Sequence, residues 1–96
     1  MIKIKVYLVS YEISRYSKKI YKLYKTIKEC AFEENWVQCL NNMWIIKSDA
    51  DINNIYEKLK ETLDDSDFFV IAEITKNCDG WLDTNIWEYL NNNILS

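Results

Sequence analysis

The stretch from Ile2 to Glu12 alternates with a period of two residues, which is the pattern of a β-strand. Its even positions are aliphatic as far as residue 8, while its odd positions are Lys3, Lys5, Tyr7, Val9 and Tyr11. We therefore expect a strand with one fully apolar face and one mixed face. Glu12 follows the last aromatic residue, where the strand would run into its loop.

A helix and a hairpin are expected next. Apolar residues recur at helical spacing over residues 18–31, which predicts a helix with one apolar side. Two short apolar runs, 36–40 and 43–47, flank the pair Asn41-Asn42. Asparagine tolerates the positive φ of tight turns, so these two runs are predicted to form a β-hairpin.

The second half of the chain repeats this alternation of helix and strand. Asp49 or Asp51 is expected to cap a second helix and to place negative charge at its amino end. Residues 68–75 are rich in aromatic and branched side chains and are predicted to form a strand. Asp83 or Thr84 should begin a short terminal helix.

This order of elements predicts one α+β domain over residues 1–96. A β-α-β-β-α-β order is that of the ferredoxin-like sandwich, with two helices on one face of a four-stranded antiparallel sheet. Right-handed crossovers place the first and third strands at its centre. Among the predicted helices, only the short C-terminal one remains for the other face. We expect that open face to carry Tyr7, Val9 and Tyr11 and to be a ligand surface or a dimer interface, of which we favour the dimer interface.

The composition excludes several kinds of active site. Glycine occurs once, which excludes glycine-rich phosphate loops, and histidine is absent, which excludes Ser-His and Cys-His nucleophiles. The 3 cysteines are an odd number without a close pair, as expected in a reducing compartment rather than in a disulfide framework. No apolar run approaches the roughly 20 residues of a membrane helix. We expect a cytoplasmic protein that makes no membrane contact.

Charge is distributed unevenly along the chain. Residues 1–32 hold eight basic and two acidic side chains, a balance of +6, and the total of -3 leaves -9 for residues 33–96. The basic residues include Arg15 and a lysine row on the first predicted helix, Lys18, Lys22, Lys25 and Lys28. Such a row is most often a solvated face, and the alternative is contact with phosphates or with an acidic protein. Because phosphate contacts require concentrated positive charge, the acidic second part favours a protein partner over nucleic acid.

Several segments together resemble a known family. Residues 6–13 (VYLVSYEI), 43–49 (MWIIKSD) and 63–71 (LDDSDFFVI), with the pair Gly80-Trp81, are similar to segments of the small CRISPR-associated adaptation proteins and their SinR-like relatives. These proteins are the second core Cas proteins. The resemblance covers nearly the whole chain and depends mainly on its hydrophobic strands.

The resemblance implies a ferredoxin-like homodimer whose sheets face each other. In the family, strand-end aspartates of two subunits meet and bind a divalent metal, and members are metal-dependent nucleases or idle scaffolds. Glu12 occupies that position here. Glutamate can ligate magnesium or manganese, although its extra methylene displaces the oxygens. Under a nuclease interpretation, Glu12 is the catalytic and metal-binding candidate, with Ser10 or Tyr11 nearby; otherwise we expect no cofactor.

Three functions remain open. The first is a metal-dependent endonuclease, and the second is a non-catalytic homodimer that binds protein or nucleic acid within CRISPR or mobile-element machinery. The third is a small acidic inhibitor of phage type that binds a nucleic-acid-processing complex. We expect the second, with a protein partner at least as favoured as nucleic acid.

Overall fold

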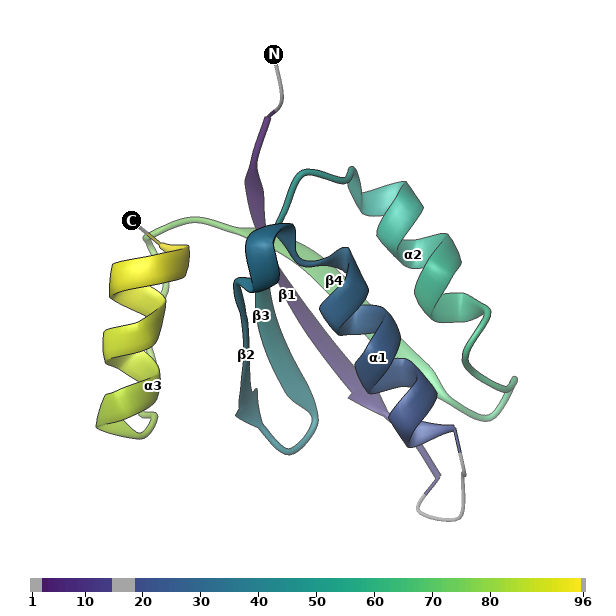
Figure 1. Cartoon of the computed structure of the whole chain (residues 1–96). Coiled ribbons are helices and arrows are strands. Elements are labelled where there is room, and N and C mark those ends of the chain that lie inside the picture. The colour runs from purple at the N-terminus through teal and green to yellow at the C-terminus, as the bar shows by residue number, and fades with distance from the viewer. Residues whose placement is uncertain (1–2, 15–18, 96) are drawn as a thin grey trace.

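A computed structural model describes residues 3–14 and 19–95 of the chain (Figure 1). Four strands form one antiparallel sheet: β1 (Lys5–Glu12), β2 (Trp36–Leu40), β3 (Met43–Ser48) and β4 (Phe68–Ile74). The helical elements are α1 (Ile20–Cys30), the 3₁₀ turn η1 (Phe32–Glu34), α2 (Ile52–Lys60), α3 (Thr84–Tyr89) and the π-helical turn η2 (Leu90–Ile94). The order of elements agrees with the prediction from the sequence.

The strands lie in the order β2-β3-β1-β4, so β1 and β3 are central, as predicted. The β2–β3 hairpin closes over Asn41 and Asn42, also as predicted. Val9 pairs with Trp44 on one side and with Ile71 on the other. This arrangement is an α+β fold that is compatible with a ferredoxin-like sandwich.

Helices α1 and α2 cover one face of the sheet (Figure 1). Leu23 and Ile27 of α1 and Ile55 and Leu59 of α2 are all buried there. They pack on alternate residues of the central strands, which are Tyr7, Val9, Tyr11, Trp44 and Ile46. The main core of the protein therefore lies between these two helices and the odd-numbered side chains of β1.

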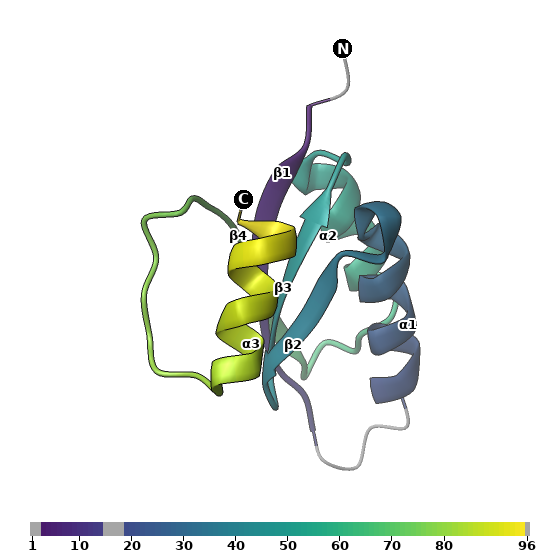
Figure 2. The same ribbon diagram turned by 60° about the vertical axis from the view of Figure 1, so that its left-hand side comes forward.

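The opposite face is partly covered by α3 and η2, as the turned view shows (Figure 2). Leu90, Ile94 and Leu95 are buried against Cys39 and Ile45 of the hairpin. Val6, Leu8 and Ile74 pack around the margin of this second core. The sheet thus has apolar residues on both faces, and the C-terminal helix lies over the β2–β3 side of the second face.

The predicted dimer interface of Tyr7, Val9 and Tyr11 is wrong. These side chains are only 1%, 0% and 5% exposed, and they face α1 and α2. Both faces of β1 are apolar, so its alternation alone does not identify the face that the two long helices cover. The helices take the aromatic face because the tyrosine hydroxyls find acceptors within the core: Tyr7 donates to the Ala50 carbonyl at 3.0 Å.

A second tyrosine hydroxyl belongs to a buried hydrogen-bonded chain. Trp44 Nε1 donates to Tyr11 Oη at 3.0 Å, and Tyr11 Oη donates to the Asn41 carbonyl at 3.2 Å. The ring of Tyr24 on α1 lies 5.3 Å from that of Trp44, between centroids. These contacts join the strand end, the hairpin turn and α1 in one aromatic cluster.

Aspartate side chains begin both helices for which they were proposed as caps. Asp51 accepts from the backbone N–H of Asn54 at 3.0 Å at the start of α2, and Asp83 accepts from Asn85 N–H at 2.9 Å at the start of α3. Each cap satisfies a backbone donor that the helix itself leaves unpaired. The first helix begins at Ile20, whereas its expected start at Lys18 lies outside the described residues.

The connection between α1 and β2 has an unusual backbone. Glu33 and Glu34 have φ of 51° and 60°, the left-handed region that side-chain-bearing residues seldom occupy. Asn35 then donates to the Phe32 carbonyl at 3.0 Å, which closes the turn before β2 begins.

Across the described part of the chain, no helix is both long and apolar enough to cross a membrane.

Candidate functional site

The end of β1 and the start of β4 form a shallow hollow of about 430 Å³. Glu12 lies there, exposed, and its direct cross-strand neighbour is Phe68. Ser10 is paired with Val70 in the same way. Since directly paired residues share a face of the sheet, these four side chains lie together on the second face. We refer to Ser10, Glu12, Phe68 and Val70 as the open strip.

The β4 half of the open strip is apolar and accessible. Phe68 and Val70 are 64% and 63% exposed. Helix α3 and the turn η2 pack on this face of the sheet over the β2–β3 hairpin instead. An accessible apolar pair on a regular strand is typical of a binding surface rather than of a solvated one. The chemistry that the strip offers is hydrophobic contact, with a single carboxylate at its margin.

A second hollow of about 300 Å³ lies on the same face, between the sheet and residues 78–87. Its floor includes Leu8, Met43 and Ile45, and Trp87 of α3 contributes to its wall. Trp81 lines it as well, yet this side chain is 99% exposed. Leu8 and Ser10 are successive second-face residues of β1, so this hollow adjoins the open strip.

Among the residues that the structure describes, Glu12 is not part of a metal-ligating cluster. Within residues 3–14 and 19–95, no group of three or more His, Cys, Asp or Glu side chains is placed to hold an ion. The residues that share its hollow are neutral: Ser10, Tyr11, Asn42, Phe68, Phe69 and Val70. Magnesium and manganese prefer several oxygen ligands, and one carboxylate beside a phenylalanine does not supply them.

The nearby aspartates stabilise the turn before β4. Asp67 accepts from the backbone N–H of Asp64 at 3.0 Å and from that of Ser14 at 3.3 Å. Asp64 forms an ion pair with Lys19 at the start of α1. These contacts tie the turn to the end of β1 and so position the open strip.

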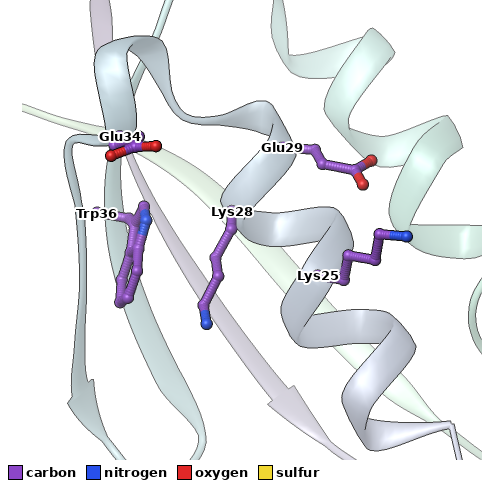
Figure 3. Close-up of a pocket in the computed structure, with 5 residues that line it drawn as sticks. All are labelled: Lys25, Lys28, Glu29, Glu34 and Trp36. Atoms are coloured by element: carbon purple, nitrogen blue, oxygen red, sulfur yellow. The ribbon is translucent and has the colours of Figure 1, made fainter.

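The lysine row lies on a different layer of the molecule. Lys22, Lys25 and Lys28 are exposed on α1, while Arg15 and Lys18 lie outside the described residues. Lys28 Nζ is 4.7 Å from the centroid of Trp36, a cation–π contact seen in Figure 3. The row is therefore on the helix layer, away from Glu12 and the open strip.

Opposite charges share the hollow beside Trp36 (Figure 3). Its volume is about 510 Å³, and its lining is Lys25, Lys28, Glu29, Glu34 and Trp36. The two carboxylates reduce the positive potential that a phosphate group would require. This hollow suits a mixed or neutral contact better than a nucleic-acid backbone.

The cysteines belong to the cores. Cys30 and Cys39 are buried and Cys78 is half-buried, all as free thiols. Burial raises the pKa of Cys39 to about 11, and it also raises the pKa of Cys30. A thiol with a raised pKa carries little thiolate at neutral pH and is a poor nucleophile. Cys30 and Cys39 therefore act as small apolar side chains in packing.

Sequence reasoning identified Glu12 and its neighbour Ser10 but missed the apolar partners beside them. The apolar strand 68–75 could be read as buried on both faces or as covered on one face by a partner, so Phe68 and Val70 were not singled out, and no role was given to Leu40, which is 50% exposed. The available signal was the combination of a predicted edge strand with only one helix left for the second face. Known proteins add no assignment: no family model matches this chain, and no curated protein matches it.

Proposed function

We propose that this chain is a non-catalytic interaction protein that acts as a homodimer within a nucleic-acid-handling machinery of the CRISPR or mobile-element kind. In this proposal it has the ferredoxin-like fold of the second core Cas proteins and their SinR-like relatives, and it works in the cytoplasm. The observation that carries the proposal is the open strip, in which Phe68 and Val70 remain 64% and 63% exposed on a regular strand.

The size of the apolar contribution supports self-association. Burying a phenylalanine or valine side chain fully stabilises by roughly 1.5–3 kcal/mol. Covering the exposed parts of Phe68 and Val70 in both copies would therefore contribute about 5 kcal/mol. Association itself costs about 4–15 kcal/mol, so the strip provides a substantial part of the required energy and needs further contacts beside it.

The environment of Glu12 supports a non-catalytic role. Metal-assisted phosphodiester cleavage requires ions held in fixed geometry against the attacking and the leaving oxygen. Glu12 is exposed at a strand end beside Phe68, and among the described residues that line its hollow none supplies a second carboxylate. An apolar strip that includes one acidic margin suits recognition of a protein surface.

Light scattering of the purified chain tests the self-association. The wild type should have twice the monomer mass of 11.6 kDa at micromolar concentration. Val70→Arg places a charge on the strip and should give the monomer. The matched control is Tyr21→Arg, because Tyr21 is 78% exposed on α1 and lies in the helix layer. A wild type that stays monomeric at all concentrations would refute the homodimer.

A nuclease assay tests the non-catalytic part separately. Labelled RNA and DNA should remain intact over hours with magnesium or manganese, and Glu12→Ala should change neither this result nor the mass. Steady cleavage by the wild type that Glu12→Ala abolishes would instead establish the endonuclease alternative, with Glu12 as metal ligand. Salt-dependent binding of nucleic acid to the lysine row would be a different result, lost in Lys25→Ala and Lys28→Ala.

A further inference from the structure

The two edges of the sheet differ in how they are protected. The β2 edge is short, its register shifts between Gln38 and Leu40, and α3 packs beside it (Figure 1). The β4 edge is longer, pairs with β1 without a shift, and contains one charged residue, Glu73. Natural sheets normally protect such edges with bulges, prolines, charges or covering elements, since an unprotected edge pairs with another strand. Among the described residues, β1 is the only strand that pairs with β4.

The backbone groups that β4 leaves open can be identified from the pairing. The N–H of Tyr11 donates to the Asn42 carbonyl at 3.0 Å, so the odd residues of β1 direct their backbone groups toward β3. Because this direction alternates along a strand, the even residues of β1 bond to β4, and their partners there are Phe68, Val70, Ala72 and Ile74. The N–H and C=O groups of Phe69, Ile71 and Glu73 therefore point outward, along the open edge.

We propose that the β4 edge pairs with the β4 edge of a second copy of this chain, antiparallel, with Ile71 opposite the partner's Ile71. The two sheets then form one continuous sheet across a two-fold axis. This proposal rests on the homodimer proposed above and specifies how it is built. It uses every outward backbone group of the strand, since Ile71 pairs with its own counterpart and Phe69 pairs with the partner's Glu73.

Charge and the length of β4 favour this register over its two neighbours. With Ile71 on the two-fold axis, the only charged residue of the strand lies opposite an aromatic ring. A shift of two residues in one direction brings Glu73 opposite the partner's Asp67, a like-charge pair that is unfavourable. The opposite shift requires Thr75, which lies beyond the end of β4. Antiparallel pairing also brings the acidic turn before β4 toward the partner's Lys76, which carries the opposite charge.

The same geometry accounts for the apolar strip. On the second face, Phe68 becomes the neighbour of the partner's Ile74, and Val70 becomes the neighbour of the partner's Ala72. Aromatic and branched cross-strand neighbours stabilise sheet pairing. A second copy thus fits both the backbone of the edge and the exposed side chains beside it.

Amide hydrogen exchange at two protein concentrations tests the edge directly. In the dimer, the amides of Phe69, Ile71 and Glu73 should exchange at least about tenfold more slowly than at a concentration where the chain is monomeric. The amides of Val70 and Ala72 already bond to β1, so they provide the internal reference. A dimer in which the outward amides exchange as fast as in the monomer would overturn the edge pairing while leaving the homodimer intact.

A proline substitution provides the second test. Glu73 is exposed and its N–H points outward, so Glu73→Pro is compatible with the folded monomer at an edge strand. The substitution removes one interchain donor from each copy and should weaken dimerisation roughly 30-fold or more. Glu73→Ala removes the same charge but keeps the N–H, so it should dimerise like the wild type. Equal dimerisation of a folded Glu73→Pro variant would refute the edge pairing, and a monomeric wild type would refute the homodimer itself.

Discussion

Replacing Tyr11 with phenylalanine should destabilise the protein far more than its one-atom change suggests. Tyr11 Oη accepts from Trp44 Nε1 at 3.0 Å and donates to the Asn41 carbonyl at 3.2 Å. Trp44 is 2% exposed, so its indole N–H would be left buried and unpaired in the variant. The loss of a net hydrogen bond costs about 1 kcal/mol and the orphaned donor about 1–3 kcal/mol more. We expect a total of about 2–4 kcal/mol.

Urea unfolding followed by circular dichroism measures this difference, and Tyr7→Phe is the matched control. Tyr7 Oη donates to the Ala50 carbonyl at 3.0 Å and accepts from no described donor, so its loss should cost about 1 kcal/mol. The urea concentration at the midpoint of unfolding should be lower for Tyr11→Phe than for the wild type. The slope of the free energy of unfolding against urea concentration should stay the same. If both variants lost the same small free energy of unfolding, below about 0.5 kcal/mol, the reasoning would be refuted. Such a result is expected for tyrosine hydroxyls that are exposed to water and not buried in the core.

Three further outcomes are expected. Asp51→Ala should lower the free energy of unfolding by about 1 kcal/mol, since it removes the cap on Asn54 N–H, whereas Asp49→Ala, at an exposed position outside the cap, should change it little. At pH 8, iodoacetamide should alkylate Cys78 before Cys39, because burial raises the pKa of Cys39 to about 11; mass spectrometry of timed samples checks the order. Burial, followed by the charges of Glu73 and Asp51, also raises the pKa of Tyr7. The unfolded chain therefore loses this proton first, near its ordinary pKa of about 10. Stability should fall as pH rises above that value, with a shallower slope in Tyr7→Phe in urea titrations.

The features that could be predicted from the sequence are those that short segments determine. The Asn41-Asn42 pair between two apolar runs specifies a hairpin by its own turn chemistry, and Asp51 caps α2 through a contact three residues away. The central position of β1 followed from the handedness of crossovers. Each of these rules depends on neighbouring residues or on chirality, so no knowledge of packing was required.

The face assignments could not be predicted in this way. β1 presents aliphatic residues on one side and Tyr7, Val9 and Tyr11 on the other, and both sides are buried or partly buried in the structure. Which face the two long helices cover depends on where the tyrosine hydroxyls find hydrogen-bond acceptors. These acceptors are the carbonyls of Ala50 and Asn41, which lie far from β1 in the sequence. The exposure of Phe68 and Val70 likewise depends on a distant segment, because it is set by how much of the second face α3 covers.

The central position of the first strand has a consequence for the speed of folding. Val6 pairs with Lys47 and with Ile74, so β1 needs partners that lie far along the chain, whereas the β2–β3 hairpin closes locally. Long-range pairing pays the entropy of loop closure before it gains contacts, and folding slows as such contacts dominate. During synthesis, β1 leaves the ribosome well before β3 and β4 exist to receive it. Of these four strands, β1 therefore waits longest for a partner: β3 is complete only at Ser48, and the other edge of β1 stays open until β4 is made.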